Sequence, residues 1–423
     1  MRQTPAVRSR LPRRLSDGDL ESSRPRPGTT GLVIVDEPIA NCGRSCVTPK
    51  ERVIAAIEHR QPDRVPVGEM AIDFEMTERA LGHPTLYRSK WKEYEALWEG
   101  RRDEIVTSYA HDIVELVRHF DLDYLAIPLA PARKAHYERP EFVGDYMWRD
   151  STGRVWQYSP ESEGHAMCVN PIDMGPDDIV MPPDPAPVDW SRLEHFEYII
   201  KELGPSHFIM GRVTAGLFPW QETLGSLDGF LLKMYDDPAF VEKAVEAQTR
   251  EAVAYAQAML EMGCDAVSPD GDVCDNRGPT MGPTLFRKYS LPSIKRLADA
   301  IHAKGGYDIK HSDGNTWSIL EDFIEAGVDG WQGIQPRVGM DLKLLKERYG
   351  DQLCFFGGVD VDTLVAGTPD DVAAQVRYAL KYASQDGGLV VGCGNTVMPG
   401  IKFENFETML ATARELGTYP IGL

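Results

Sequence analysis

From about residue 48 the chain alternates between helical and strand-like spacing of its apolar residues. Thr48-Pro49-Lys50-Glu51 forms a capping box with proline at the first helical position, and Val53, Ile54 and Ile57 follow on one helical face. This pattern predicts a helix that stops near Arg60. The segment Asp63–Val67 then predicts a first strand.

The alternation becomes regular from about residue 205. Expected strands cover 122–127, 207–213, 264–269, 307–311, 328–334, 353–357 and 389–392. Expected helices cover 225–234, 238–262, 284–304 with a break at Pro292, 318–326, 341–350, 369–382 and 403–416. Strands separated by helices of about 10–20 residues pair in parallel.

So many strand–helix repeats predict an α/β fold, a (β/α)8 TIM-like barrel formed as one domain by residues 47–423. An open doubly wound sheet is the alternative, but no glycine-rich phosphate fingerprint follows the first strand. Residues 130–200 are irregular and Pro-rich, and we expect them to form an insertion. Within them, Trp148, Trp156 and Tyr158 flank a turn and predict a β-hairpin.

Composition narrows the possible partners. The formal net charge of −20 argues against nucleic acid and anionic membranes. No stretch approaches the ~20 apolar residues of a transmembrane helix. Seven scattered cysteines fit a reducing cytoplasm. Residues 1–46 are rich in Pro, Arg, Ser and Gly and predict a disordered extension. A homodimer is compatible with these features.

In a barrel the functional groups follow the carboxyl ends of the strands. Polar residues at these positions are Glu69, Asp73, Asp270, Asp272, His311, Asp313, Asn315, Gln335, Asp360, Cys393 and Asn395. Asp270 and Asp272 are candidate catalytic carboxylates, although Asp-Gly is also a common turn. Glu69, Asp73, Asn315, Gln335 and Asn395 are candidate substrate-binding residues.

His311, Asp313 and Cys393 could form a metal site. Positions i and i+2 of an extended segment project to the same side, and Cys393 follows the last strand. One imidazole, one carboxylate and one thiolate with an open fourth position is the usual arrangement of catalytic zinc. The alternative is a glycine-flanked turn in which Asp313 caps an amide and Cys393 is a small buried filler.

Several segments resemble the uroporphyrinogen decarboxylase superfamily. They are Thr48–Val67, Pro283–His311, Gly357-Gly358-Val359-Asp360 with Gly367-Thr368-Pro369, and Cys393–Glu404, so that the similarity covers about residues 48–418. The resemblance implies a distorted (β/α)8 barrel. The superfamily includes the haem-pathway decarboxylase, which needs no metal, and cobalamin-dependent methyltransferases.

The chain departs from the decarboxylase pattern after the first strand. Where the decarboxylase has an arginine-rich segment, this chain has the acids Glu69, Asp73 and Glu75. Like charges a few ångströms apart cost on the order of 1–4 kcal/mol each, so a porphyrinogen with many carboxylates is an unsuitable substrate. The methyltransferase branch has a zinc site of the form His-x-Cys followed by a later Cys. His311 and Cys393 match that pattern, and Asp313 replaces the middle Cys.

The resemblance therefore favours a zinc-dependent methyltransferase with one zinc per chain. It would move a methyl group from a methoxy- or methylamine-type donor to a corrinoid on a separate protein, since the chain lacks an Asp-x-His-x-x-Gly corrinoid motif. In this hypothesis Asp270 or Asp272 orients the substrate or supplies a proton. Two alternatives remain: a metal-independent decarboxylase, and a non-catalytic tetrapyrrole- or corrinoid-binding protein.

Overall fold

The computed structural model describes residues 47–135, 137–160, 166–215, 218–221 and 223–423. The expected disordered extension, residues 1–46, lies outside these described residues. The described chain begins with α1 (Pro49–Ile57), whose capping box is formed as predicted by the side chains of Thr48 and Glu51. None of the described helices combines the length and the apolar character needed to span a bilayer.

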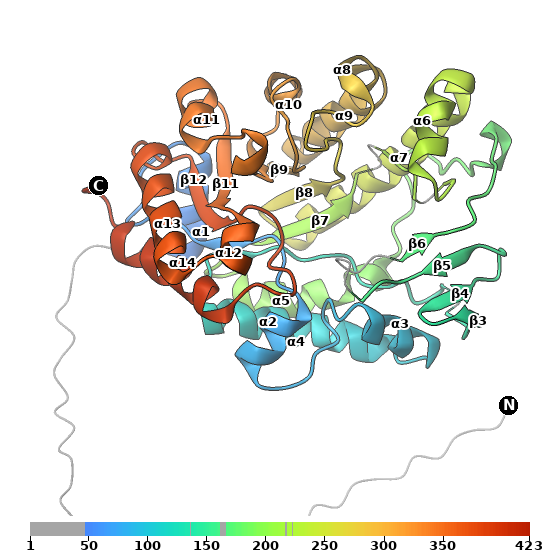
Figure 1. Cartoon of the computed structure of the whole chain (residues 1–423), viewed down its shortest axis with the longest axis horizontal. Coiled ribbons are helices and arrows are strands. Elements are labelled where there is room, and N and C mark those ends of the chain that lie inside the picture. The colour runs from blue at the N-terminus through green and yellow to red at the C-terminus, as the bar shows by residue number, and fades with distance from the viewer. Residues whose placement is uncertain (1–46, 136, 161–165, 216–217, 222) are drawn as a thin grey trace, which may run out of the picture. The chain divides into compact units, whose positions relative to one another are not determined.

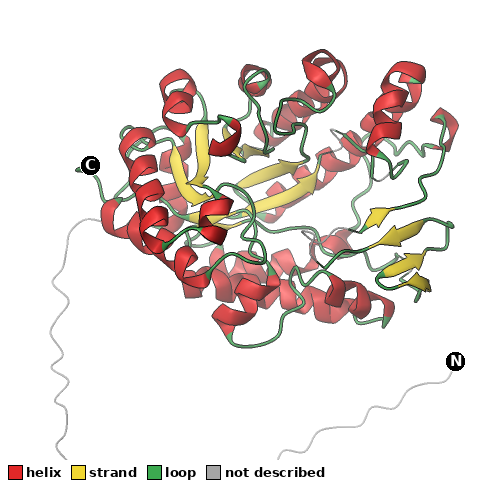
Figure 2. Ribbon diagram, in the orientation of Figure 1, coloured by secondary structure: helices red, strands yellow, loops and turns green. Residues whose placement is uncertain are grey.

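Eight parallel strands of the described chain form the barrel (Figures 1 and 2). A continuous six-stranded sheet runs in the order β12-β11-β10-β9-β8-β7, and β1 pairs with β2. Single bridges from Val67 to Val391 and from Ile127 to Gly211 connect this pair to β12 and β7, which closes the ring. The strands are β1 (Gly68–Glu69), β2 (Tyr124–Leu125), β7 (Met210–Thr214), β8 (Ala266–Asp270), β9 (Tyr307–His311), β10 (Gly330–Gln332), β11 (Cys354–Val359) and β12 (Leu389–Cys393).

Helices cover the outside of the ring and bury an apolar layer against it. Those in the first half are α2 (Phe74–Leu81), α3 (Trp91–Trp98), α4 (Arg102–Phe120), α5 (Glu194–Leu203), α6 (Leu227–Asp236) and α7 (Pro238–Met262). Those in the second half are α8 (Gly282–Leu285), α9 (Leu291–His302), α10 (Leu320–Ala326), α11 (Leu342–Tyr349), α12 (Val361–Ala366), α13 (Pro369–Ala383) and α14 (Phe403–Leu416). The break expected at Pro292 is a π-helical turn, Phe286–Ser290, just before α9.

The inside of the barrel is filled by a separate apolar cluster. Met70, Tyr124, Met210, Ile309 and Phe356 belong to it and are at most 2% exposed. Because side chains alternate along a strand, Ile309 and His311 share the inward face of β9. The packed interior closes the barrel below, so His311 faces the open end above it.

The expected insertion contains an antiparallel sheet of four strands, outside the barrel. These are β3 (Glu141–Gly144), β4 (Met147–Arg149), β5 (Val155–Gln157) and β6 (Met167–Cys168). The predicted hairpin is β4–β5, with Trp148 opposite Trp156. Trp148 and Tyr158 are buried against Trp91 and Trp98, so aromatic packing holds this sheet to α3.

Candidate active site

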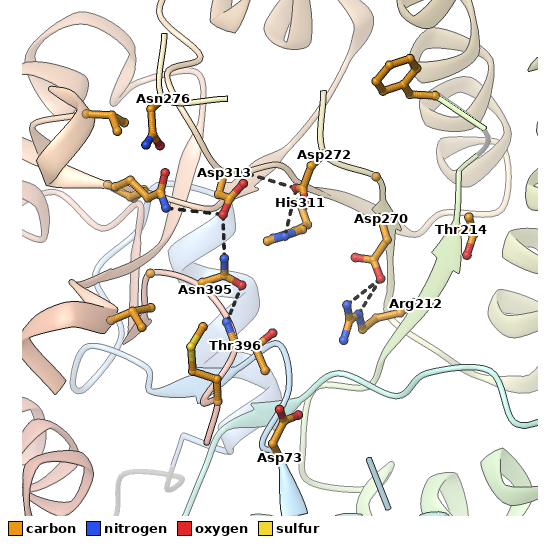
Figure 3. Close-up of a pocket in the computed structure, with 18 of the residues that line it drawn as sticks. Asp73, Arg212, Thr214, Asp270, Asp272, Asn276, His311, Asp313, Asn395 and Thr396 are labelled. Atoms are coloured by element: carbon orange, nitrogen blue, oxygen red, sulfur yellow. Dashed lines mark hydrogen bonds and ion pairs between the residues drawn. The ribbon is translucent and has the colours of Figure 1, made fainter. Parts of the chain in front are cut away.

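A cavity of 930 Å³ lies at the carboxyl ends of the barrel strands (Figure 3). Its lining includes residues that end or follow six strands: Thr214, Asp270, His311, Gln335, Asp360 and Asn395. Phe218 and Trp220, from the segment after β7, also line it. The strand-end rule therefore located the cavity correctly from the sequence.

Of the polar strand-end residues predicted from the sequence, eight line the cavity. They are Asp73, Asp270, Asp272, His311, Asp313, Gln335, Asp360 and Asn395. Glu69, Asn315 and Cys393 are not among the lining side chains. The side chain of Asn315 instead accepts a hydrogen bond from the Trp317 amide and donates to the carbonyl of Val338, so it shapes the loop after β9.

Carboxylates outnumber guanidinium groups in this lining. The six acids are Asp73, Asp270, Asp272, Asp313, Asp360 and Asp362, and the three arginines are Arg88, Arg212 and Arg337. Each arginine already contacts an aspartate of the lining: Arg88 contacts Asp73, Arg212 contacts Asp270, and Arg337 contacts Asp360 and Asp362. The lining therefore holds no guanidinium that lacks a carboxylate partner, among the residues described.

Arg212, within β7, and Asp270, at the end of the neighbouring strand β8, form a pair with two contacts. Arg212 donates from Nε and Nη2 to Oδ2 of Asp270, at 2.9 and 2.6 Å, and Nη1 donates to the carbonyl of Met70. Burial alone would raise the pKa of Asp270, but the guanidinium of Arg212 lowers it below its ordinary value. Asp270 is therefore an ionised acceptor at neutral pH, which favours the orienting role over the proton-donating role.

His311 lies between an amide and a carboxylate. Its Nδ1 contacts Oε1 of Gln332, and its Nε2 lies 3.4 Å from Oδ1 of Asp272. Gln332 is 1% exposed and donates from Nε2 to the carbonyls of Cys393 and Asn395, at 3.1 and 3.2 Å. Gln332 was not predicted as a site residue because it lies inside the strand expected over 328–334, although the structure ends β10 at this residue.

Asp313 is held by two amide side chains of the predicted site. Its Oδ2 accepts a hydrogen bond from Asn395 at 2.7 Å and a longer one from Gln335 at 3.5 Å (Figure 3). Gln335 also accepts from the backbone amide of Gly314. The loops after β9, β10 and β12 therefore meet at one carboxylate.

Cys393 and Glu69 are buried next to each other rather than exposed in the cavity. Each is 1% exposed, and both oxygens of Glu69 accept from the backbone amide of Cys393, at 3.0 and 3.2 Å. Burial raises the pKa of Glu69 well above its ordinary value, although the hydrogen bond from the Cys393 amide acts in the other direction. Glu69 was expected to bind substrate; the structure places it as an anchor for the end of β12.

The predicted zinc ligands do not form a metal-binding arrangement. In the part of the chain that the structure describes, no group of three or more His, Cys, Asp or Glu could hold a metal ion. The thiol of Cys393 lies 3.6 Å from the carbonyl oxygen of Thr396, at a buried position. His311, Asp313 and Cys393 thus do not fit the zinc set as arranged here, and zinc binding stays a prediction.

Two buried residues of the site region were absent from the sequence prediction. Lys310 is fully buried, and its ammonium donates to the carbonyls of Pro269, Gly271 and His311. Burial lowers the pKa of Lys310 below its usual value, while Asp272 and Asp270 raise it. Lys90 lies 3.0 Å from Asp73, opposite Arg88. Both lysines lie behind the lining, where they hold backbone and carboxylate groups in place.

The fold and the cavity together define the class of protein. It is a (β/α)8 barrel with a polar cavity at the carboxyl ends of its strands. The sequence model of one family, uroporphyrinogen decarboxylase (URO-D), matches residues 194–416. The chain belongs to this family. The expected superfamily and fold are thereby confirmed.

Curated relatives fall into both activities of the family. Methylcobamide:CoM methyltransferase MtaA of Methanosarcina barkeri is 26% identical over 227 residues, which cover 53% of this chain and 62% of that protein. Uroporphyrinogen decarboxylase of Pelodictyon phaeoclathratiforme is 27% identical over 192 residues, covering 43% and 51%. The chain therefore matches only about half to three-fifths of the length of these relatives.

Among solved structures, a methyltransferase from Methanosarcina mazei is similar to this chain with a TM-score of 0.62 and 20% sequence identity. The match covers 87% of this chain and 99% of that one. At 20% identity, the similarity of the two structures shows that they share a fold.

Proposed function

We propose that this protein is a methyltransferase that takes a methyl group from a small neutral or cationic donor of the methoxy or methylamine type. The acceptor in this proposal is a corrinoid carried by a separate protein. The observation that carries the proposal is the surplus of carboxylates in the cavity. The similarity to a curated methyltransferase agrees with it, at low identity.

The charges of the lining oppose the alternative substrate, a porphyrinogen. Arg88, Arg212 and Arg337 each already neutralise an aspartate of the lining. Each carboxylate of a polyanionic substrate would meet further carboxylates, at a cost on the order of 1–4 kcal/mol per close pair. A neutral or cationic methyl donor avoids this cost and gains from Asp272, which is 55% exposed.

Methyl transfer places simple demands on the side chains. The bond between the methyl carbon and the oxygen or nitrogen of the donor breaks, the leaving group keeps the electron pair, and the methyl group passes to the acceptor. A neutral donor leaves as an anion that then takes up a proton, whereas a cationic ammonium donor leaves as a neutral amine. His311 and Asp272 lie together at the cavity surface, where a proton can be held or relayed. The ionised Asp270, fixed by Arg212, is suited to orienting a hydrogen-bond donor of the substrate.

We propose zinc binding separately from the methyl transfer. A bound zinc would have to bring the thiol of Cys393 together with His311 and Asp313, which the present arrangement does not do. Elemental analysis of protein purified without chelators tests this part. We expect about one zinc per chain, lost in His311→Ala and Cys393→Ala while the fold is retained. Wild-type protein free of metal would remove zinc from the proposal.

The transfer itself is tested with free cob(I)alamin as acceptor and a panel of methoxy and methylamine compounds as donors. Formation of methylcob(III)alamin, followed by absorbance, is the expected result. Replacement of His311 by Ala should slow it by about a hundredfold or more if that side chain takes part in proton transfer. Failure of every neutral and cationic donor, with turnover of a carboxylate-rich compound instead, would contradict the proposal.

A metal-independent decarboxylase is the second candidate. The similarity to curated decarboxylases favours it. It predicts release of carbon dioxide from a small acid in protein that contains no metal, and tolerance of Cys393→Ser. The two candidates are therefore separated by their products.

A further inference from the structure

The buried amide of Gln332 connects three parts of the site. It lies on β10, its Nε2 reaches the segment after β12, and its Oε1 reaches His311 at the end of β9. A Cβ atom on Gly330, two residues earlier, would meet Phe356 and Ile309 of the barrel interior. Gln332 therefore belongs to the inward face of its strand, the same face as His311.

The orientation of this amide follows from its partners. A carbonyl oxygen can only accept, and Nε2 of Gln332 faces two of them, those of Cys393 and Asn395. Turning the amide over would place Oε1 against both carbonyls, with three acceptors facing one another and no donor. The nitrogen therefore faces the carbonyls, and Oε1 faces the imidazole.

This orientation fixes the hydrogen on the imidazole. Oε1 of Gln332 is an acceptor only, so Nδ1 of His311 must donate to it. In a neutral ring the hydrogen then lies on Nδ1, and Nε2 carries a lone pair. A histidine side chain free in water prefers the opposite form, with the hydrogen on Nε2.

We propose that Gln332 is a positioning residue that holds neutral His311 in the Nδ1–H tautomer, with the Nε2 lone pair directed at the cavity. Nε2 lies 3.4 Å from Oδ1 of Asp272, so two acceptors face the same point. A substrate N–H or O–H that approaches from the cavity can donate to either acceptor. In this neutral state Nε2 of His311 accepts a hydrogen bond, and it can pass a proton to a leaving group only after it has itself been protonated.

The test is nitrogen-15 and carbon-13 NMR of protein labelled in histidine, which distinguishes the two tautomers by their ring shifts. Spectra are recorded at about pH 9, well above the usual histidine pKa of about 6.5. The signals of His311 are assigned by their loss in His311→Ala. We expect a protonated Nδ1 and an unprotonated Nε2. A ring with its hydrogen on Nε2, or one protonated at both nitrogens, would overturn the proposal.

Two isosteric variants separate positioning from packing. Gln332→Glu keeps an acceptor for Nδ1 and Gln332→Met removes it, while both lose the amide hydrogens that reach Cys393 and Asn395. We expect Nδ1 to stay protonated in Gln332→Glu and the hydrogen to move to Nε2 in Gln332→Met. His302, which pairs with Asp329 on the outside of the barrel, is the internal control and should not change.

A purely structural role for Gln332 would leave the tautomer of His311 the same in all three proteins, and that result also overturns the proposal. If Gln332→Met fails to fold, the wild-type spectrum alone still decides it. Neither measurement depends on methyl transfer, so the proposed function and this inference can fail separately.

Discussion

Glu69 lies on β1 and Cys393 at the end of β12. Both carboxyl oxygens of Glu69 accept hydrogen bonds from the backbone amide of Cys393. This contact fixes the point at which the last strand enters the site. Asn395, two residues later, donates a hydrogen bond to Asp313. The position of the end of β12 therefore determines where these two side chains lie in the cavity.

Glu69→Ala should therefore destabilise the protein by about 2–4 kcal/mol, because it leaves a cavity and a buried amide without an acceptor. Glu69→Gln keeps an acceptor of the same shape and should cost about 1 kcal/mol. The midpoints of unfolding in denaturant measure both. Equal losses in the two variants would show that packing, rather than the hydrogen bond, is what matters.

Glu93 should make stability depend on pH. Burial raises its pKa to about 7 from an ordinary value near 4.5, although a hydrogen bond from Tyr109 and the charge of Arg88 act in the other direction. The folded state thus binds a proton more tightly than the unfolded chain does. Its contribution is complete below about pH 4.5 and is lost as the pH rises to about 7, by at most about 3 kcal/mol.

The comparison protein for this measurement is Glu93→Gln, which still accepts from Tyr109 but does not titrate. The free energy of unfolding of the wild type, relative to this variant, should fall between pH 4.5 and 7. A constant difference across that window would show that Glu93 titrates normally in the folded protein.

The pair of Arg212 and Asp270 should behave as one unit. Arg212→Met leaves the carboxylate of Asp270 without its cation and should cost about 2–3 kcal/mol, less than for a fully buried pair, because both side chains keep some exposure. Asp270→Asn in the same protein should recover part of that loss. A double-mutant cycle in denaturant measures the coupling, and additive losses would argue against a direct interaction.

Uroporphyrinogen should not be turned over. Each of the three arginines of the lining already contacts a carboxylate of the protein, so the cavity offers no surplus cation to a polyanion among its described residues. Chromatography of the porphyrins after incubation should show no product above the enzyme-free level. Formation of coproporphyrinogen would disprove the charge argument.

Much of the barrel could be predicted because its outer elements carry strong local signals. Helix α7 begins with a proline at its first position and ends before Gly263, and its predicted bounds match the structure. The first strand was less well placed. The apolar residues Val65 and Val67 are buried, but the pairing with β2 is made by Gly68 and Glu69, whose side chains carry no strand signal.

The sequence predicted which residues lie at the strand ends, but not the direction in which their side chains point. His311, Asp313 and Asn395 follow strands and do reach one cavity. Cys393 also follows a strand, but it is 1% exposed and belongs to the apolar layer beneath the helices. Gln332 and Lys310 were not predicted because they lie within the expected strands and not in the segments that follow them. Which face of a strand each residue occupies depends on register, and a single sequence does not encode register locally.

The ring is closed by two isolated bridges, Val67–Val391 and Ile127–Gly211, whereas β7 through β12 share continuous ladders. Paired residues are thus fewer where β1 meets β12 and β2 meets β7 than within the six-stranded sheet. His311 and Gln332 lie in that sheet, whereas Asp73 follows β1. Amide hydrogen exchange should therefore be faster in β1 and β2 than in β9 and β10.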